Sequence, residues 1–288
     1  MGLTYTLNNK NDGLVVTGCK DLSGELIIPS EHEYEGKLYP VTEIGEFAFS
    51  DSNVTSVIIP DSVTKIGQFS FFECEGLVHV AIPSSVAVIE PVAFGGCTNL
   101  ANITIPDSVT FIGEGAFGEC RSLKSILIPN SVKTLQSQVF MGCWNLSSVI
   151  LPNTINNIEP ASFYDCRSLK SIVIPDSVTE IGTYAFQNCW ELKNIVLPKS
   201  LTTIGSGAFF ACDGLEDVVL PDSVSVIEHG AFYDCYGLKS ITIPPSVTSI
   251  GKETFKGCTS LHTIYIKNVS LLEGTSFPAT TKFVIPLH

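Results

Sequence analysis

The chain has 288 residues, of which 44% are hydrophobic and 16% are charged, so it is long enough to bury a substantial core. Its formal net charge of -13 leaves no basic surface to follow a phosphate backbone, which argues against nucleic acid as a partner. The same acidity disfavours contact with anionic lipid headgroups, and no uninterrupted run of about eighteen apolar residues is available to span a bilayer.

The first forty residues differ from the rest of the chain. Residues 1–10 show no basic start followed by an apolar run, so no secretory leader is visible in the sequence. Two short apolar runs, at residues 14–16 and 26–28, favour β-strands. A polar stretch at residues 30–39 then separates them from the remainder of the chain. We predict that residues 1–40 form an N-terminal cap.

Beyond the cap, three residue types recur at one interval of 23 positions. They are Cys74, Cys97, Cys120, Cys143, Cys166, Cys189, Cys212, Cys235 and Cys258; Phe71, Phe94, Phe117, Phe140, Phe163, Phe186, Phe209, Phe232 and Phe255; and nine prolines from Pro60 to Pro244. A repeat of this length indicates a solenoid, because one unit cannot bury its own apolar face but a row of units can.

One unit reads L-x-x-I-x-I-P-x-S-V-x-x-I-G-x-x-A-F-x-x-C-x-x, as in the unit that starts at Leu169. Ile172 and Ile174 alternate with Val173, the period of two expected for a strand. The following proline ends the strand because it has no N–H for the sheet. The A-F-x-x-C-x-x-L segment has apolar residues three apart, which suits a short helical or 3₁₀ turn.

This repeat resembles the BspA-like class of leucine-rich repeats, over roughly residues 41–266. The resemblance implies a repeat solenoid, a right-handed superhelix with a parallel β-sheet on one face and short helical or 3₁₀ turns on the other. We expect about ten to eleven coils. In this class the L-x-x-I-x-I segment supplies one strand per coil, and the A-F-x-x-C segment turns the chain on the opposite side.

The repeat pattern breaks again near the C-terminus. Lys267 stands where the proline is expected, and Phe277 follows Phe255 by 22 residues. Residues 282–285 are suited to a closing strand. We therefore predict leucine-rich repeats over residues 41–266 and a C-terminal cap over residues 267–288, since terminal units must present an outer face to water.

The periodic cysteines do not suggest a disulfide framework or a metal centre. Equivalent residues in neighbouring coils lie about 4.8 Å apart with parallel Cα–Cβ vectors, whereas a disulfide needs converging vectors at a shorter separation. No C-x-x-C pair occurs, and the five histidines have no useful spacing to the cysteines. We expect the nine thiols to fill one buried slot per coil, with no metal and no cofactor.

Catalytic motifs are also lacking in the sequence. The segment at residues 113–118 matches the dinucleotide fingerprint G-x-G-x-x-G, but another repeat follows it in place of the helix that would receive a pyrophosphate. No G-x-S-x-G, H-E-x-x-H or phosphate-loop sequence occurs. We expect a non-enzymatic protein, with a hydrolase assembled from distant residues as the disfavoured alternative.

A candidate binding surface follows from the strand alternation. If the strand isoleucines point inward, the residues between them form an outward row: Ala81, Thr104, Leu127, Ile150, Val173, Val196, Val219, Thr242 and Tyr265. The row is aliphatic from Leu127 to Val219, beside polar residues such as Ser171 and Asp217. This composition is typical of an interaction surface. The preference of β-branched residues for strands explains it equally well, and self-association is a third alternative.

A second candidate lies one residue after the cysteines, where Arg121, Trp144, Arg167, Trp190, Asp213 and Tyr236 follow one another. Arginine side chains could stack on the indoles of the next coil, which would make this column a structural ladder. Alternatively, Trp144, Trp190 and Tyr236 are aromatic anchors for a protein or glycan partner.

The resemblance implies a bacterial surface or secreted protein that adheres to host or neighbouring-cell components, with a protein partner such as an extracellular-matrix or cell-surface component. Partner-binding candidates are Leu127, Ile150, Val173, Val196, Val219, Tyr265, Trp144, Trp190 and Tyr236. An intracellular protein-protein interaction scaffold in the cytoplasm is the competing function. It suits the free thiols and the missing leader equally well.

Overall fold

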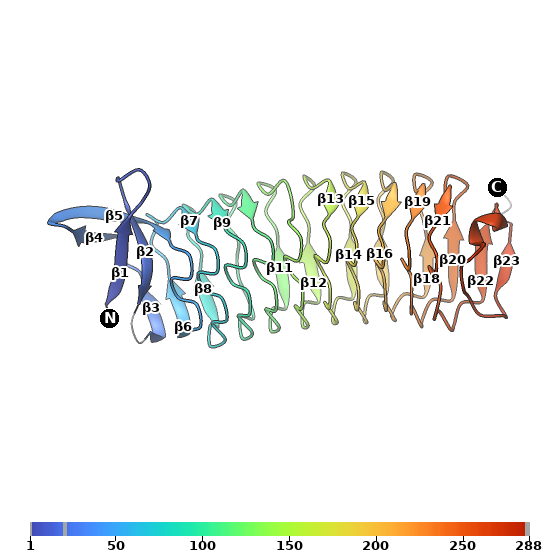
Figure 1. The fold of residues 1–288 in the computed structure, drawn as a ribbon, viewed down its shortest axis with the longest axis horizontal. Helices are drawn as coiled ribbons and strands as arrows, with labels where there is room; N and C mark the ends of the chain where they lie inside the picture. The colour runs from blue at the N-terminus through green and yellow to red at the C-terminus, as the bar shows by residue number, and fades with distance from the viewer. Residues whose placement is uncertain (1, 20–21, 286–288) are drawn as a thin grey trace. The chain divides into compact units, whose positions relative to one another are not determined.

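A computed structural model describes residues 2–19 and 22–285, so the extreme ends of both predicted caps lie outside the described residues. The chain divides into two compact units, residues 1–146 and residues 147–288. In each unit the chain winds into stacked coils whose strands run side by side in parallel sheets (Figure 1). The predicted repeat solenoid is confirmed in both units.

The first unit begins with two antiparallel hairpins. Strand β1 (Leu3–Leu7) pairs with β2 (Leu14–Cys19), and β4 (Glu31–Tyr34) pairs with the first half of β5 (Lys37–Ile44). The polar stretch at residues 30–39 is thus a hairpin, which extends away from the coils at the blue end of the chain (Figure 1). Its turn residues Glu35 and Gly36 both have positive φ, as a two-residue hairpin turn requires.

Two sheets run through the first unit. The larger has the order β1-β2-β5-β7-β9-β10, and it is parallel from β2 onward. The smaller has the order β3-β6-β8. The strands not yet placed are β3 (Ser23–Ile27), β6 (Asn53–Ile58), β7 (Lys65–Ile66), β8 (His79–Ala81), β9 (Val88–Ile89), β10 (Phe111–Ile112) and β11 (Ser125–Leu127). The strands predicted at residues 14–16 and 26–28 correspond to β2 and β3.

The second unit also contains two kinds of strand per coil. The longer strands are β12 (Ser148–Ile150), β14 (Ser171–Val173), β16 (Asn194–Val196), β18 (Asp217–Val219), β20 (Ser240–Ile243), β22 (Thr263–Ile266) and β23 (Lys282–Val284). The two-residue strands β13 (Asn157–Ile158), β15 (Glu180–Ile181), β17 (Thr203–Ile204), β19 (Val226–Ile227) and β21 (Ser249–Ile250) form a five-stranded sheet. Strand β23 fulfils the prediction of a closing strand at residues 282–285.

The register of these sheets equals the sequence repeat. Ser171, Ile172 and Val173 of β14 pair with residues one repeat later, Asn194, Ile195 and Val196 of β16. The short strands keep the same interval, as in the pairing of Ile181 with Ile204. A 23-residue rhythm in the sequence therefore becomes rows of like side chains in space.

Strand alternation works as predicted in these coils. Ile172 and Ile174 are buried, and Val173 between them is exposed. The second sheet was not predicted, because its two-residue strands are too short to show a period of two. Ile181 and Ile204 of that sheet are fully buried, so each coil closes its core from two sides.

The A-F-x-x-C side of each coil consists of hydrogen-bonded turns. Gln187 N donates to the Tyr184 carbonyl and Cys189 N donates to the Phe186 carbonyl, both at 3.2 Å and both of the 3₁₀ type. Two residues with positive φ, Tyr184 and Asn188, interrupt the run and prevent a continuous helix. Among the described residues, one 3₁₀ helix is present, η1 (Val269–Leu272).

Stacked phenylalanines fill the centre of each unit. In the second unit the rings of Phe163 and Phe186 lie 5.3 Å apart with an interplanar angle of 5°, and Phe186 and Phe209 follow at 5.5 Å and 2°. The first unit repeats this geometry from Phe49 to Phe140. All of these rings are buried, and offset stacking of this kind adds to the free energy gained by burying them.

Candidate binding surfaces

A row of exposed aliphatic side chains runs along the second unit. Its members are the last residues of β12, β14, β16 and β18, and their exposed fractions lie between 57 and 70%. They are Ile150, Val173, Val196 and Val219, and we call them the aliphatic row. Ile150, Val173 and Val219 each lie between two buried residues, and Val196 lies between two half-buried ones, so packing of the neighbouring residues against the core fixes the outward direction of the side chain.

Polar side chains border the aliphatic row on both sides. Ser171, Asn194 and Asp217 come two residues before the row on the same strand face, and all three are exposed. On the other side, exposed residues such as Asp176 and Asp222 follow the strand-ending prolines. The arrangement is an apolar strip inside a polar rim, which is the anatomy of a binding surface.

The predicted outward row changes character at its C-terminal end. Thr242 and Tyr265 continue it in register after Val219, but both are half-buried. Tyr265 pairs with Val284 of the closing strand β23, which brings an extra strand beside it. Tyr265 is therefore a less accessible candidate than the four aliphatic residues.

Leu127 lies in the first unit at the outward position of β11 and is also exposed. Ala81 at the same position of β8 is exposed but small. Thr104 is exposed as well, in a segment without strand pairing among the described residues. In the first unit, Leu127 is therefore the one large aliphatic side chain among these three outward positions.

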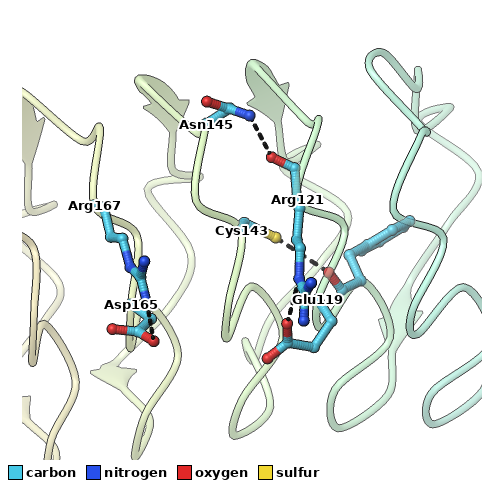
Figure 2. Close-up of polar contacts among 7 residues, drawn as sticks. Glu119, Arg121, Cys143, Asn145, Asp165 and Arg167 are labelled. Atoms are coloured by element: carbon cyan, nitrogen blue, oxygen red, sulfur yellow. Dashed lines mark hydrogen bonds and ion pairs between the residues drawn. The ribbon is translucent and has the colours of Figure 1, made fainter.

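The predicted stacking of arginine on tryptophan is present in both units. In the first, the guanidinium of Arg121 lies 4.1 Å from the centre of the Trp144 ring, and in the second that of Arg167 lies 4.6 Å from the centre of Trp190. Carboxylates hold both guanidinium groups, through Arg121 Nε to Glu119 at 3.1 Å and Arg167 to Asp165 at 3.2 Å (Figure 2). These contacts agree with a structural ladder.

The aromatic candidates differ in accessibility. Trp144 is half-buried, whereas Trp190 and Tyr236 of the second unit are exposed. The charge of Asp234 and, after it, burial raise the pKa of the Tyr236 hydroxyl, and burial raises the pKa of the nearby Asp213 carboxyl. Because both are exposed, Trp190 and Tyr236 remain accessible for contact with a partner; Tyr236 lies beside Asp234, and Trp190 carries the Arg167 guanidinium over its ring.

The repeated cysteines are buried and unbridged, in line with the predicted packing role. Their thiols donate to the carbonyl of the phenylalanine one coil earlier, as Cys189 does to Phe163 at 3.2 Å and Cys143 does to Phe117 at 3.1 Å (Figure 2). Burial raises the pKa of several of these thiols, among them Cys97, Cys189 and Cys212, and to about 12 for Cys120. Such thiols stay protonated and unreactive near neutral pH.

Within residues 2–19 and 22–285, no group of three or more His, Cys, Asp or Glu side chains is placed to hold a metal ion. The Gly113-to-Gly118 fingerprint is followed by another coil of turns and not by a helix, so it lacks the helix N-terminus of a dinucleotide site. No helix in this described part is long and apolar enough to cross a membrane.

Sequence reasoning missed two features of the turn side. Each coil carries two residues with positive φ, one before the A-F pair and one before the cysteine. The Asp, Asn and Gly residues frequent before cysteine, such as Asp165 and Asn188, were the signal that could have indicated them. The second feature is a notch in the first unit, where glycines leave a column of large side chains incomplete.

Parallel strands at a fixed 23-residue interval define the class of a short-repeat β-solenoid. The family model for the BspA type leucine rich repeat region, which comprises six copies of the repeat, matches residues 42–170 and again residues 156–283. The chain therefore belongs to the BspA-type leucine-rich repeat family. A sequence comparison with curated proteins gave no match.

Solved structures show the same fold. A leucine rich cell surface protein from Faecalibacterium prausnitzii is 27% identical, with 96% of each chain covered and a TM-score of 0.54. The leucine rich repeat protein of T. pallidum is 28% identical over 74% of this chain and 87% of its own, also with a TM-score of 0.54. The pneumococcal vaccine antigen PcpA, 23% identical over 97% and 93% with a TM-score of 0.55, supports the fold alone.

Proposed function

We propose that the chain is a non-enzymatic protein-binding module, an adhesin-like protein that is secreted or held at a bacterial cell surface. It binds host or neighbouring-cell components through its repeat surface. The aliphatic row carries this proposal, because four large apolar side chains lie exposed in one line with a polar rim. Contiguous exposed apolar surface of this kind is uncommon unless a partner covers it.

The surface location is supported by a relative. The Faecalibacterium prausnitzii protein, which covers almost the whole of this chain, is described as a cell surface protein. The partner that best fits an apolar strip with a polar rim is another protein, such as an extracellular-matrix component. Trp144, Trp190 and Tyr236 are the aromatic side chains that we propose for further contacts with a protein or a glycan.

One observation favours an intracellular scaffold as the second candidate function. The cysteines of the described residues form no disulfide, and a reducing compartment keeps thiols in that state. Labelling of intact producing cells with an antibody against this chain separates the two candidates. Signal on intact cells supports the surface protein, and signal only after lysis contradicts it.

The binding role is tested with the double substitution Val173→Glu and Val196→Glu. Two carboxylates in the middle of the aliphatic row disrupt an apolar contact with a partner, because both would be buried without a compensating charge. We expect at least a tenfold loss of binding to immobilised extracellular-matrix and cell-surface extracts. The melting temperature stays almost unchanged, since both valines are exposed.

A matched control adds the same charge elsewhere on the second unit. Asn156→Glu and Ser249→Glu alter exposed residues beside or within the short-strand sheet. This control keeps full binding if the aliphatic row is the contact. Equal loss in both variants would mean that net charge governs binding, and unfolding of the Val173→Glu, Val196→Glu protein would mean that the row belongs to the core.

A further inference from the structure

A column of large side chains follows the core phenylalanines along the turn side, one position after each of them. In the first unit this column reads Ser50, Phe72, Gly95, Gly118 and Met141. Two consecutive coils therefore lack a side chain between a phenylalanine and a methionine. In the second unit the same column reads Tyr164, Gln187, Phe210, Tyr233 and Lys256, without a glycine.

A notch with a volume of about 370 Å³ lies beside these two glycines. At Gly95 the Val92 side chain takes the place of a Cβ, whereas the atoms nearest to a Cβ at Gly118 are backbone atoms at 3.2 Å and beyond. Phe72 and Met141 line its two ends, and Val92 contributes a third apolar wall. The glycines Gly95, Gly96, Gly115 and Gly118 also line it, so the turn backbone forms part of the floor. A space of this size accommodates one large apolar side chain with part of its backbone.

The rim of the notch carries an excess of negative charge. Glu73 and Glu75 line it on the coil that bears Phe72, and Glu119 lines it on a later coil. Arg121 is the cation of this rim, and it is already engaged by Glu119 at 3.1 Å and by the face of Trp144 at 4.1 Å.

The carboxylates at the Phe72 end thus have no cation among the residues that line the notch. Burial and then the neighbouring Asp51 carboxyl raise the pKa of Glu73, as crowding of like charges does. A positive group placed beside Glu73 and Glu75 relieves this crowding. The charge complementarity therefore selects a cationic partner, and the apolar walls select an apolar side chain next to that charge.

We propose that the notch is a peptide-binding site: a partner protein inserts one large apolar side chain over Gly118, against Val92, and places a lysine or arginine beside Glu73 and Glu75. The site lies on the turn side of the first unit. It is independent of the aliphatic row, whose four residues belong to the strands of the second unit.

Isothermal titration calorimetry with three short peptides tests the recognition chemistry. The probes are Gly-Lys-Phe-Lys-Gly, Gly-Lys-Gly-Lys-Gly and Gly-Glu-Phe-Glu-Gly, each with blocked ends. We expect the first to bind at least ten times more tightly than either of the others, because it alone combines the apolar side chain with positive charge. A phenylalanine side chain moved from water into an apolar site accounts for a tenfold difference or more.

Filling the notch tests its location. Gly118→Met places at Gly118 the residue that the next coil already carries at Met141, and the new Cβ lies 3.2 Å from the Gly115 carbonyl, which a small backbone adjustment relieves. We expect this variant to keep its circular dichroism spectrum and to bind the first peptide at least tenfold more weakly. The matched control, Gln187→Met, makes the same change at the equivalent position of the second unit and keeps wild-type binding.

A second variant does not depend on tolerance of a larger side chain. Glu73→Gln with Glu75→Gln preserves the shape of the rim and removes two charges, so binding of the lysine peptides falls while the preference for phenylalanine over glycine persists. The proposal is overturned if the first peptide shows no saturable binding, if the glycine peptide binds equally well, or if folded Gly118→Met binds like the wild type. Wild-type peptide binding by the Val173→Glu, Val196→Glu protein separates this site from the proposed function.

Discussion

Phenylalanine and cysteine act together at the centre of each coil. Phe186 stacks between Phe163 and Phe209, and its carbonyl accepts a hydrogen bond from the thiol of Cys212 at 3.1 Å. The same carbonyl also accepts from Cys189 N at 3.2 Å. The ring of each phenylalanine thus fills the core, and its carbonyl accepts hydrogen bonds from two cysteines. Because each cysteine depends on a phenylalanine in this way, the two residue types keep a common period.

The first prediction concerns this core ring. We expect Phe186→Ala to reduce the free energy of unfolding by about 3–5 kcal/mol, because the substitution removes apolar burial and leaves a cavity between two fixed rings. Val173→Ala is the control, and as an exposed change it costs less than about 0.5 kcal/mol. Urea unfolding of both variants measures the difference. A small effect at Phe186 would show that neighbouring coils collapse into the space.

The turn around the A-F-x-x-C segment is the element whose backbone geometry is hardest to predict from the sequence. Strands could be located because buried isoleucines and exposed valines alternate, as in residues 172–174. The positive φ values could not be located so easily, because Phe47, Val92 and Tyr184 hold the same position as Gly207. Bulky residues in that conformation are strained, so composition alone misleads.

The second prediction uses two residues of that turn position. Ala161 has φ of 53° and Gly230 has φ of 61°, and a Cβ added at Gly230 would meet no atom closer than 3.6 Å. We expect Gly230→Ala to lower the free energy of unfolding by about 1 kcal/mol, and Ala161→Gly to raise it by a similar or smaller amount. Denaturant midpoints of the two proteins check this. Shifts of the same sign would refute left-handed strain as the cause.

The candidate surfaces were predictable to different degrees. Alternation along one strand was enough to place the aliphatic row, since the inward-pointing aliphatic residues on either side fix its direction. The notch depends on the absence of side chains at Gly95 and Gly118, on consecutive coils, and on the charges that surround it. Its glycines were visible in the sequence, but their meaning requires knowing that the turn column is otherwise filled.

At the scale of the whole molecule, the raised pKa values of the repeated cysteines act together on stability. Burial raises the pKa of several repeated thiols, among them Cys97, Cys120, Cys189, Cys212 and Cys235. In the unfolded chain a cysteine ionises near pH 8.5, whereas folded Cys120 keeps its proton up to about pH 12. Between these values the unfolded state binds fewer protons than the folded state.

The third prediction follows from that difference. Below about pH 8.5 the thiols are protonated in both states, and they do not reduce the free energy of unfolding. As pH rises from there toward 12, the free energy of unfolding falls by up to about 1.4 kcal/mol per thiol for each pH unit. We expect the melting temperature to fall steeply between pH 8 and pH 10.5. Cys189→Ala with Cys212→Ala is the control and shows a shallower fall. An identical slope would assign the alkaline loss to other groups.

The bond from each thiol to the phenylalanine carbonyl of the preceding coil has a consequence for how such a chain can change. A coil completes its predecessor and offers the same unfinished end to its successor, so any coil can follow any other. Growth or shrinkage by one full 23-residue module preserves every such junction. The coil between Phe49 and Phe71 is one residue shorter, and the Cys74 thiol still donates to the Phe49 carbonyl at 3.0 Å, so a small change of length is absorbed within a coil while the junction is kept. Duplication of whole modules is therefore the natural route by which this architecture grows.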